Sequence, residues 1–323
     1  EYIVMHYQTF SLIMDAVRNF PRTVYNLMGW AQSNPRDYNS SIMRNFVLSM
    51  SQSDTETFRS ECDFVRNIPL SRINEIFLPY KTRLGFEDFY DKFQVVHGRE
   101  NGLPYILHEN TKKVFFPVGT TVHAMIENYK CLLLREGITG KGILEASPHC
   151  YQDDDFFVEN GDCVLDIGCA EALFAIDNID KAKKVYLFEC EKFWQKPLKA
   201  TFSQYADKVC ITKKTVSSIT SKRTTRLSDV VAKDGALEDR YFVKMDIEGG
   251  EKEVISGNAD FLRQNKVKLS CCVYHNQEDA SLIKNMLEKI GYETRFSKGY
   301  MLCDMNGVHF PYFRHGVIYA RNY

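Results

Sequence analysis

Short apolar runs of strand type alternate with amphipathic runs of helix type from about residue 156 onward. Strands are predicted at 163–167, 184–189, 208–213, 241–246, 267–274, 292–296 and 316–321. Helices are predicted at 171–180, 195–205, 251–264 and 279–290, with Asn276 as the N-cap of the last one. This alternation predicts an α/β fold with a parallel, doubly wound sheet. The last two strands have no helix between them, which predicts an antiparallel pair at one edge of the sheet.

The first half of the chain has a different pattern. Apolar positions at helical spacing, divided by prolines, predict an N-terminal helical lobe that covers the site or serves as a dimerisation arm. After it, the runs 103–108 and 113–116 flank a polar turn and are followed by a helical pattern at 120–134. We therefore expect a cap segment made of a hairpin and a helix. The predicted divisions of the chain are 1–80, 81–155 and 156–323.

Composition narrows the class of protein. The formal net charge of −1 gives no argument for nucleic-acid binding. The ten cysteines include no C-x-x-C pair, which favours buried free thiols in a reducing compartment over a zinc–thiolate site. No apolar run reaches ~18 residues, and the N-terminal stretch lacks the basic region and cleavage site of a secretory signal. We therefore expect no membrane span and a cytoplasmic protein.

Acidic residues end two neighbouring strands of the predicted sheet. The first strand ends in Asp166-Ile167-Gly168, and the second ends in Glu189, whose carboxylate can accept both hydroxyls of a ribose. The G-x-G-x-x-G fingerprint of dinucleotide sites is missing. Asp166 would repel a pyrophosphate but attract the amino group of a methionine moiety. This edge favours S-adenosylmethionine (AdoMet) as the ligand, with a nicotinamide cofactor as the alternative.

A third acidic strand end adds a sequence signature. The run Lys244-Met245-Asp246-Ile247-Glu248-Gly249-Gly250-Glu251 matches a Lys-x-Asp-x-Glu-Gly-x-Glu pattern. With this signature, residues 100 to 323 or so resemble the FkbM family of AdoMet-dependent methyltransferases. The resemblance implies a class I methyltransferase fold, with a Rossmann-like seven-stranded sheet and AdoMet over the carboxyl ends of the strands. Residues 156–323 would then be the AdoMet-binding methyltransferase domain.

Positions of the cofactor-binding residues follow from the same resemblance. Asp166 and Gly168 would border the methionine part, Glu189 would hold the ribose, and Ser217 would lie near the adenine. The full predicted set is Asp166, Gly168, Cys169, Glu171, Glu189, Ser217 and Asp246. One departure from the family is Ala172, which stands where many relatives have glycine, and we expect its methyl group to tighten the cofactor pocket.

Methyl transfer to a hydroxyl needs a group that draws the proton away. His275, at the end of the predicted fifth strand, is the first candidate base, and its alternative role is to cap or orient the next helix. Asp246 is the second candidate, with binding of the cofactor's amino group or orientation of His275 as alternatives. His149, Glu248 and Tyr274 are candidates for contact with the methyl acceptor. Asp246, Glu248 and His275 together could instead bind a divalent metal.

The leading functional hypothesis is O-methylation of a hydroxyl on a sugar, glycan or secondary metabolite. A catalytically idle AdoMet-binding scaffold and a nicotinamide oxidoreductase are the alternatives, and N-methylation is a minor variant. The expected partners are a small-molecule or glycan acceptor and, through the N-terminal lobe, a second copy of the chain. Nucleic acid is not expected.

Overall fold

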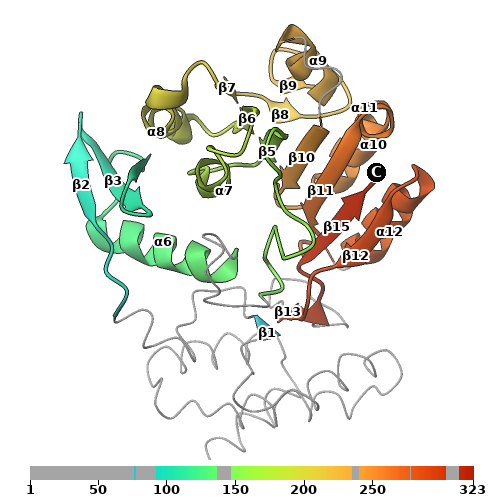
Figure 1. The fold of residues 1–323 in the computed structure, drawn as a ribbon, viewed down its shortest axis with the longest axis horizontal. Helices are drawn as coiled ribbons and strands as arrows, with labels where there is room; N and C mark the ends of the chain where they lie inside the picture. The colour runs from blue at the N-terminus through green and yellow to red at the C-terminus, as the bar shows by residue number, and fades with distance from the viewer. Residues whose placement is uncertain (1–75, 78–91, 137–146, 235–239, 277, 303–312) are drawn as a thin grey trace, which may run out of the picture. The chain divides into compact units, whose positions relative to one another are not determined.

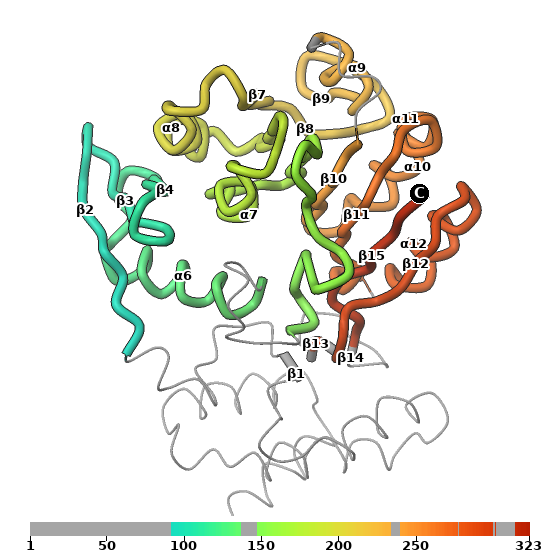
Figure 2. The backbone as a smooth tube through the Cα atoms, in the orientation of Figure 1, coloured from blue at the N-terminus to red at the C-terminus, as the bar shows by residue number. Residues whose placement is uncertain are grey.

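The computed structural model describes residues 76–77, 92–136, 147–234, 240–276, 278–302 and 313–323 of the chain (Figures 1 and 2). The predicted N-terminal helical lobe lies almost wholly outside these residues. The chain divides into two compact units, of which the larger comprises Gln94–Glu145, His149–Ser297 and Gly316–Tyr323. Within the described part of the smaller unit, a three-stranded sheet is formed by β1 (Ile76–Phe77), β13 (Tyr300–Leu302) and β14 (Phe313–Arg314).

A seven-stranded sheet forms the centre of the larger unit. Its strands lie in the order β12-β15-β11-β10-β5-β6-β7. They are β5 (Cys163–Ile167), β6 (Lys184–Phe188), β7 (Val209–Thr212), β10 (Arg240–Met245), β11 (Lys266–Cys272), β12 (Glu293–Phe296) and β15 (Val317–Arg321). The strands from β11 to β7 are parallel, and β15 runs antiparallel to both of its neighbours. The predicted seven-stranded, class I methyltransferase sheet with an antiparallel edge is confirmed.

Helices cover both faces of this sheet, which explains why its central strands are mostly apolar. On one face, Leu165 and Val243 pack against side chains of α10 (Glu251–Gly257), α11 (Ala259–Gln264) and α12 (Asp279–Lys289). On the other face, Phe242 lies against Phe174 of α7 (Leu173–Asp177), with 5.6 Å between the ring centroids. Shorter helices, α8 (Gln195–Thr201) and α9 (Leu227–Val231), complete the connections.

The cap segment contains the predicted hairpin and helix. Strands β3 (Leu103–His108) and β4 (Lys112–Phe115) pair antiparallel, and β2 (His97–Glu100), which was not predicted, adds a third strand. Helix α6 (Val122–Arg135) begins after Thr121, whose hydroxyl accepts a hydrogen bond from the amide of Ala124 at 3.1 Å.

One buried histidine joins the cap to the sheet. The His108 ring lies between the Tyr129 hydroxyl of α6 and the Asp177 carboxylate of α7, at 3.0 Å from each. Because its two nitrogens contact two different helices, this ring fixes the position of α6 relative to α7. The carboxyl end of α6 is thereby held near the edge of the sheet.

Several element boundaries differ from the prediction. The predicted helix 251–264 is interrupted at Asn258, whose side chain accepts from the amide of Leu227 at 2.9 Å and donates to the carbonyl of Val254 at 2.9 Å. The prediction that Asn276 caps α12 was wrong. Glu278 directly precedes this helix, and Asn276 instead donates from its amide and its side chain to Asp279 at 2.8 and 2.9 Å.

The cysteines of the described residues are all free thiols, and most are buried, as predicted. Among the same residues, no helix combines the length and the apolar character that crossing a membrane requires.

Candidate active site

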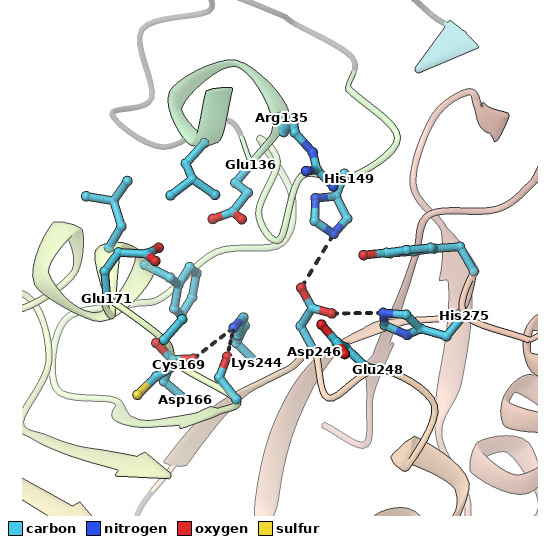
Figure 3. A pocket seen from close by; sticks show the side chains of 16 residues that line it. Arg135, Glu136, His149, Asp166, Cys169, Glu171, Lys244, Asp246, Glu248 and His275 are labelled. Carbon is cyan, nitrogen blue, oxygen red and sulfur yellow. Dashed lines mark hydrogen bonds and ion pairs between the residues drawn. The ribbon is translucent and has the colours of Figure 1, made fainter. Parts of the chain in front are cut away.

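A cavity of about 270 Å³ opens at the carboxyl ends of β5 and β10 (Figure 3). Its lining comes from the loops after β5 and β10, from the residues that follow β11, and from the carboxyl end of α6. Ligands in open α/β sheets bind at this edge, so the position agrees with the expected crevice.

Left-handed backbone conformations are concentrated in the loops around the cavity. Gly168 has φ = 73°, and the non-glycine residues Ala170, Ala172 and Glu248 have φ values of 46°, 59° and 55°. Non-glycine residues pay about 1 kcal/mol or more for such a conformation, and such strain tends to cluster at functional sites. Ala172 is fully buried and does not line the cavity, so its methyl group does not narrow the pocket in the way we expected.

Gly168 is required by a contact within the protein. A Cβ atom at this position would lie 2.1 Å from the backbone oxygen of Asp246, which belongs to the neighbouring strand end. The structure shows that the absent side chain lets the ends of β5 and β10 approach each other. Gly168 also lines the cavity, and its expected place beside the methionine part of the cofactor stays a prediction.

A buried ion pair lies beneath the cavity. The ammonium of Lys244 is 3.1 Å from Asp166 and donates a hydrogen bond to the Gly168 carbonyl at 2.8 Å. Burial raises the pKa of Asp166, although Lys244 opposes this effect. Burial alone would lower the pKa of Lys244, but the charges of Asp166 and Asp246 raise it. We expected the amino group of a ligand beside Asp166. The structure shows that the ammonium of Lys244 already lies beside this carboxylate.

Asp246 is the centre of a second polar cluster. The Tyr151 hydroxyl donates to its Oδ2 at 2.7 Å, and His275 Nε2 lies 3.3 Å from its Oδ1. Behind it, the other nitrogen of His275 lies 3.1 Å from Glu251. Burial alone would raise the pKa of Asp246, but the hydrogen bond from His275 and the charge of Lys244 hold it well below its usual value. Asp246 is therefore ionised at neutral pH.

The two histidines of the site have opposite protonation preferences. Although burial lowers the pKa of His275, its contacts with Asp246 and Glu251 raise it to about 9. At neutral pH this ring is a cation that bridges two carboxylates, and it has no free nitrogen to accept a proton. Burial and the charge of Arg135 lower the pKa of His149 to about 3, so this ring is neutral.

Two more carboxyl groups face the cavity from its other sides. Burial raises the pKa of Glu136, at the end of α6, to about 8, and that of Glu171, in the loop after β5, to about 7. Arg135 lies beside Glu136 on the same helix end. Sequence reasoning missed Arg135 and Glu136 because only the packing of the cap brings α6 to the sheet.

Most of the predicted site residues meet in this cavity. Those that line it are His149, Asp166, Gly168, Cys169, Glu171, Asp246, Glu248, Tyr274 and His275. Glu189 and Ser217 do not line it. The two carboxylate oxygens of Glu189 accept the amides of Ala170 and Glu191 at 3.0 and 2.7 Å. The roles of Glu189 at a ribose and of Ser217 at an adenine stay predictions.

Lys244 was not among the predicted site residues, although a signal for it was present. A lysine in the middle of the apolar run 241–245 is a charge that the fold must bury, and a buried charge needs a partner.

Asp246, Glu248 and His275, which the sequence offered as alternative ligands of a divalent metal, do not form a metal site in the structure. Among the described residues, Glu248 belongs to no cluster whose ligand atoms lie within 4.8 Å of one another. His275 turns one nitrogen to Asp246 and the other to Glu251, which is the arrangement of a hydrogen-bonded chain.

Comparison with solved structures finds methyltransferases of low sequence identity. No curated protein matches the chain. A methyltransferase FkbM from Methylobacillus flagellatus KT is 16% identical, with a TM-score of 0.39 over 60% of this chain and 52% of its own, so the matched part spans about half of that protein. A candidate methyltransferase from Streptococcus mutans, solved in complex with SAH, is 11% identical, with a TM-score of 0.34 over 51% of this chain and 90% of its own.

The family assignment comes from the sequence. The methyltransferase FkbM domain matches residues 131–300, which is more than half of the chain and includes the cavity residues from α6 to the end of β11. The chain therefore belongs to the FkbM methyltransferase domain family.

Proposed function

We propose that this protein transfers the methyl group of AdoMet to a hydroxyl group of a neutral, polyhydroxylated acceptor such as a sugar, a glycan or a secondary metabolite. The observation that carries the proposal is the charge of the cavity lining. Five carboxyl side chains line the cavity, and the cations beside them are Arg135, Lys244 and the protonated ring of His275. The carboxyl groups are Glu136, Asp166, Glu171, Asp246 and Glu248. Glu136, whose pKa is about 8, is protonated at neutral pH, so the other four carboxyl groups exceed the three cations by at most one charge. AdoMet carries a sulfonium and an ammonium against one carboxylate, so its net charge complements this small excess.

The residues present fit the methionine part of AdoMet. Glu171 and Asp166 supply carboxylates for its ammonium, and the Lys244 ammonium, already 2.8 Å from the Gly168 carbonyl, is the cation available for its carboxylate. When bound, AdoMet would supply an electrophilic methyl group. The protein's part is to hold donor and acceptor in line, which can lower the barrier by as much as ~7–11 kcal/mol.

The acceptor side is formed by Asp246 and its neighbours. Tyr151 and His275 approach the two oxygens of this carboxylate from within the protein and fix its orientation. Each oxygen keeps a further lone pair for the hydroxyl of an acceptor in the cavity. A hydroxyl that donates its hydrogen bond to Asp246 is a better nucleophile, because the carboxylate can accept the proton of the hydroxyl while its oxygen takes the methyl group and the bond from the methyl group to sulfur breaks.

Isothermal titration with S-adenosylhomocysteine (SAH) tests the cofactor. We expect binding to the wild-type protein, loss of binding in Glu189→Ala, and unchanged binding in Glu191→Ala, which removes an exposed carboxylate two residues away. A screen of sugar and phenol hydroxyls, followed by SAH release, then tests the reaction. Binding of SAH without turnover on any acceptor would favour a scaffold. Binding of NADH in place of SAH, measured by its fluorescence, would refute the proposal.

A further inference from the structure

Three potential metal ligands of different chemistry converge beside the cavity. His149 Nε2 lies 3.3 Å from the sulfur of Cys272 and 3.7 Å from Oδ2 of Asp246. The three ligand atoms all lie within 4.8 Å of one another. The residues come from three separate segments: His149 precedes β5, Asp246 follows β10, and Cys272 ends β11.

The same nitrogen of His149 faces both partners, and this distinguishes the cluster from the one around His275. The ligand atoms of Asp246, Glu251 and His275 also lie within 4.8 Å of one another, but there the two carboxylates face different nitrogens of the ring. In the His149 cluster, one point between Nε2, Oδ2 and Sγ is close to all three. A tetrahedral zinc ion with bonds of about 2.1 Å to nitrogen and 2.3 Å to sulfur places these atoms about 3.6 Å apart. The observed nitrogen–sulfur distance differs from this value by only a few tenths of an ångström.

The surroundings hold the ligands in place. The His149 ring lies between two aromatic rings, with centroids 5.2 Å from Tyr151 and 5.3 Å from Tyr274. Its side chain is 2% exposed, and Cys272 is fully buried. Such support restricts the orientation of a ligand and raises the affinity of a metal site. His149 and Asp246 also line the cavity, which leaves the fourth position of a tetrahedral ion on the cavity side.

We propose that His149, Asp246 and Cys272 form a binding site for a divalent transition metal of the zinc class. Imidazole, carboxylate and thiolate together suit zinc, whereas magnesium and calcium prefer oxygen ligands alone. On binding, the Cys272 thiol loses its proton to solvent and the sulfur forms the metal bond. Three protein ligands and one open position are the arrangement of catalytic zinc sites. The site does not depend on the identity of the methyl acceptor.

Cobalt substitution tests the site without any activity assay. The purified full chain is treated with a chelator, dialysed and titrated with Co²⁺. A sulfur ligand gives a thiolate-to-cobalt charge-transfer band in the near ultraviolet. We expect this band in the wild-type protein, at one equivalent of Co²⁺, and its loss when Zn²⁺ is added. We expect His149→Gln to weaken binding at least about tenfold.

The neighbouring cysteine provides a matched control. Cys271 is also fully buried in β11, but its side chain points to the opposite face of the sheet, into the core that α10 and α12 cover. Cys271→Ala should keep the band, whereas Cys272→Ala and Cys272→Ser should lose it. Two different variants of Cys272 are used in case one of them fails to fold, and circular dichroism shows whether each is folded. Absence of the band in the wild type, or its persistence in a folded Cys272 variant, would overturn the proposal.

Discussion

Asp166 and Asp246 lie at the ends of neighbouring strands of one sheet, yet their environments shift their pKa values in opposite directions. Burial raises the pKa of Asp166, and the ammonium of Lys244 lies 3.1 Å from its carboxylate. Asp246 also loses solvent, but Tyr151 and His275 approach both of its oxygens, and its pKa is well below the usual value. The comparison shows that the number of donors around a carboxylate, and not its place at a strand end, decides in which direction its pKa moves.

The largest effect should follow from Asp246→Asn. The single oxygen of an amide cannot replace the two carboxylate oxygens that accept hydrogen bonds from Tyr151 and His275, and an amide cannot accept the proton of a hydroxyl. We therefore expect kcat/KM for methyl transfer to fall by about 10²–10⁴. SAH affinity, measured by titration, should change little. Asp166→Asn should show the reverse, with weaker SAH binding. Equal losses of affinity in both variants would remove the distinction between the two strand ends.

The next largest effect should come from Lys244→Met. This change leaves Asp166 as a buried carboxylate without its cation, and breaking a buried pair in this way costs about 3–5 kcal/mol of unfolding free energy. Urea denaturation measures the loss. Arg263→Met breaks an exposed pair with Asp260, 2.8 Å apart, and should cost at most about 1 kcal/mol. Similar costs for the two variants would show that the Lys244 pair is not buried in solution.

A smaller effect should appear in the pH dependence of stability. Burial raises the pKa of Glu171 to about 7, so between its unfolded value near 4.5 and pH 7 the folded state binds this proton more tightly. The unfolding free energy of the wild type should therefore fall as pH rises through this window. In Glu171→Gln this contribution, at most about 3 kcal/mol, should be absent. Parallel pH profiles of the two proteins would contradict a raised pKa.

The smallest expected effect tests the strain beside the cavity. Ala172 has φ = 59°, a conformation that glycine adopts without steric cost, so Ala172→Gly should stabilise the fold by up to about 1 kcal/mol. Ala175→Gly, three residues later and inside α7, should destabilise by about 1 kcal/mol or more because glycine weakens a helix. Thermal unfolding compares the two. A stabilising Ala175→Gly, or a strongly destabilising Ala172→Gly, would argue against the left-handed loop.

The sheet could be predicted from the sequence far better than the site. The central strands carry their own signal in short apolar runs, and the acidic residues at the ends of β5 and β10 mark the edge that faces the cavity. Contacts between distant segments carry no such signal. Nothing in the sequence around Glu136 indicates that α6 ends beside the sheet, because this depends on the His108 contacts with Tyr129 and Asp177. Similarly, the protonation of His275 depends on Glu251, which the sequence assigned only to a helix terminus.

The placement of β15 affects how the protein can be synthesised. This strand is translated after all other strands of the seven-stranded sheet, yet it lies in the interior of the sheet, between β11 and β12. Until the ribosome has released it, β11 presents an unpaired edge, of the kind that attracts other extended chains. Completion of the sheet must therefore wait until β15 has left the ribosome, and the nascent chain needs protection from aggregation until then. Premature termination before Val317 would leave that edge open permanently.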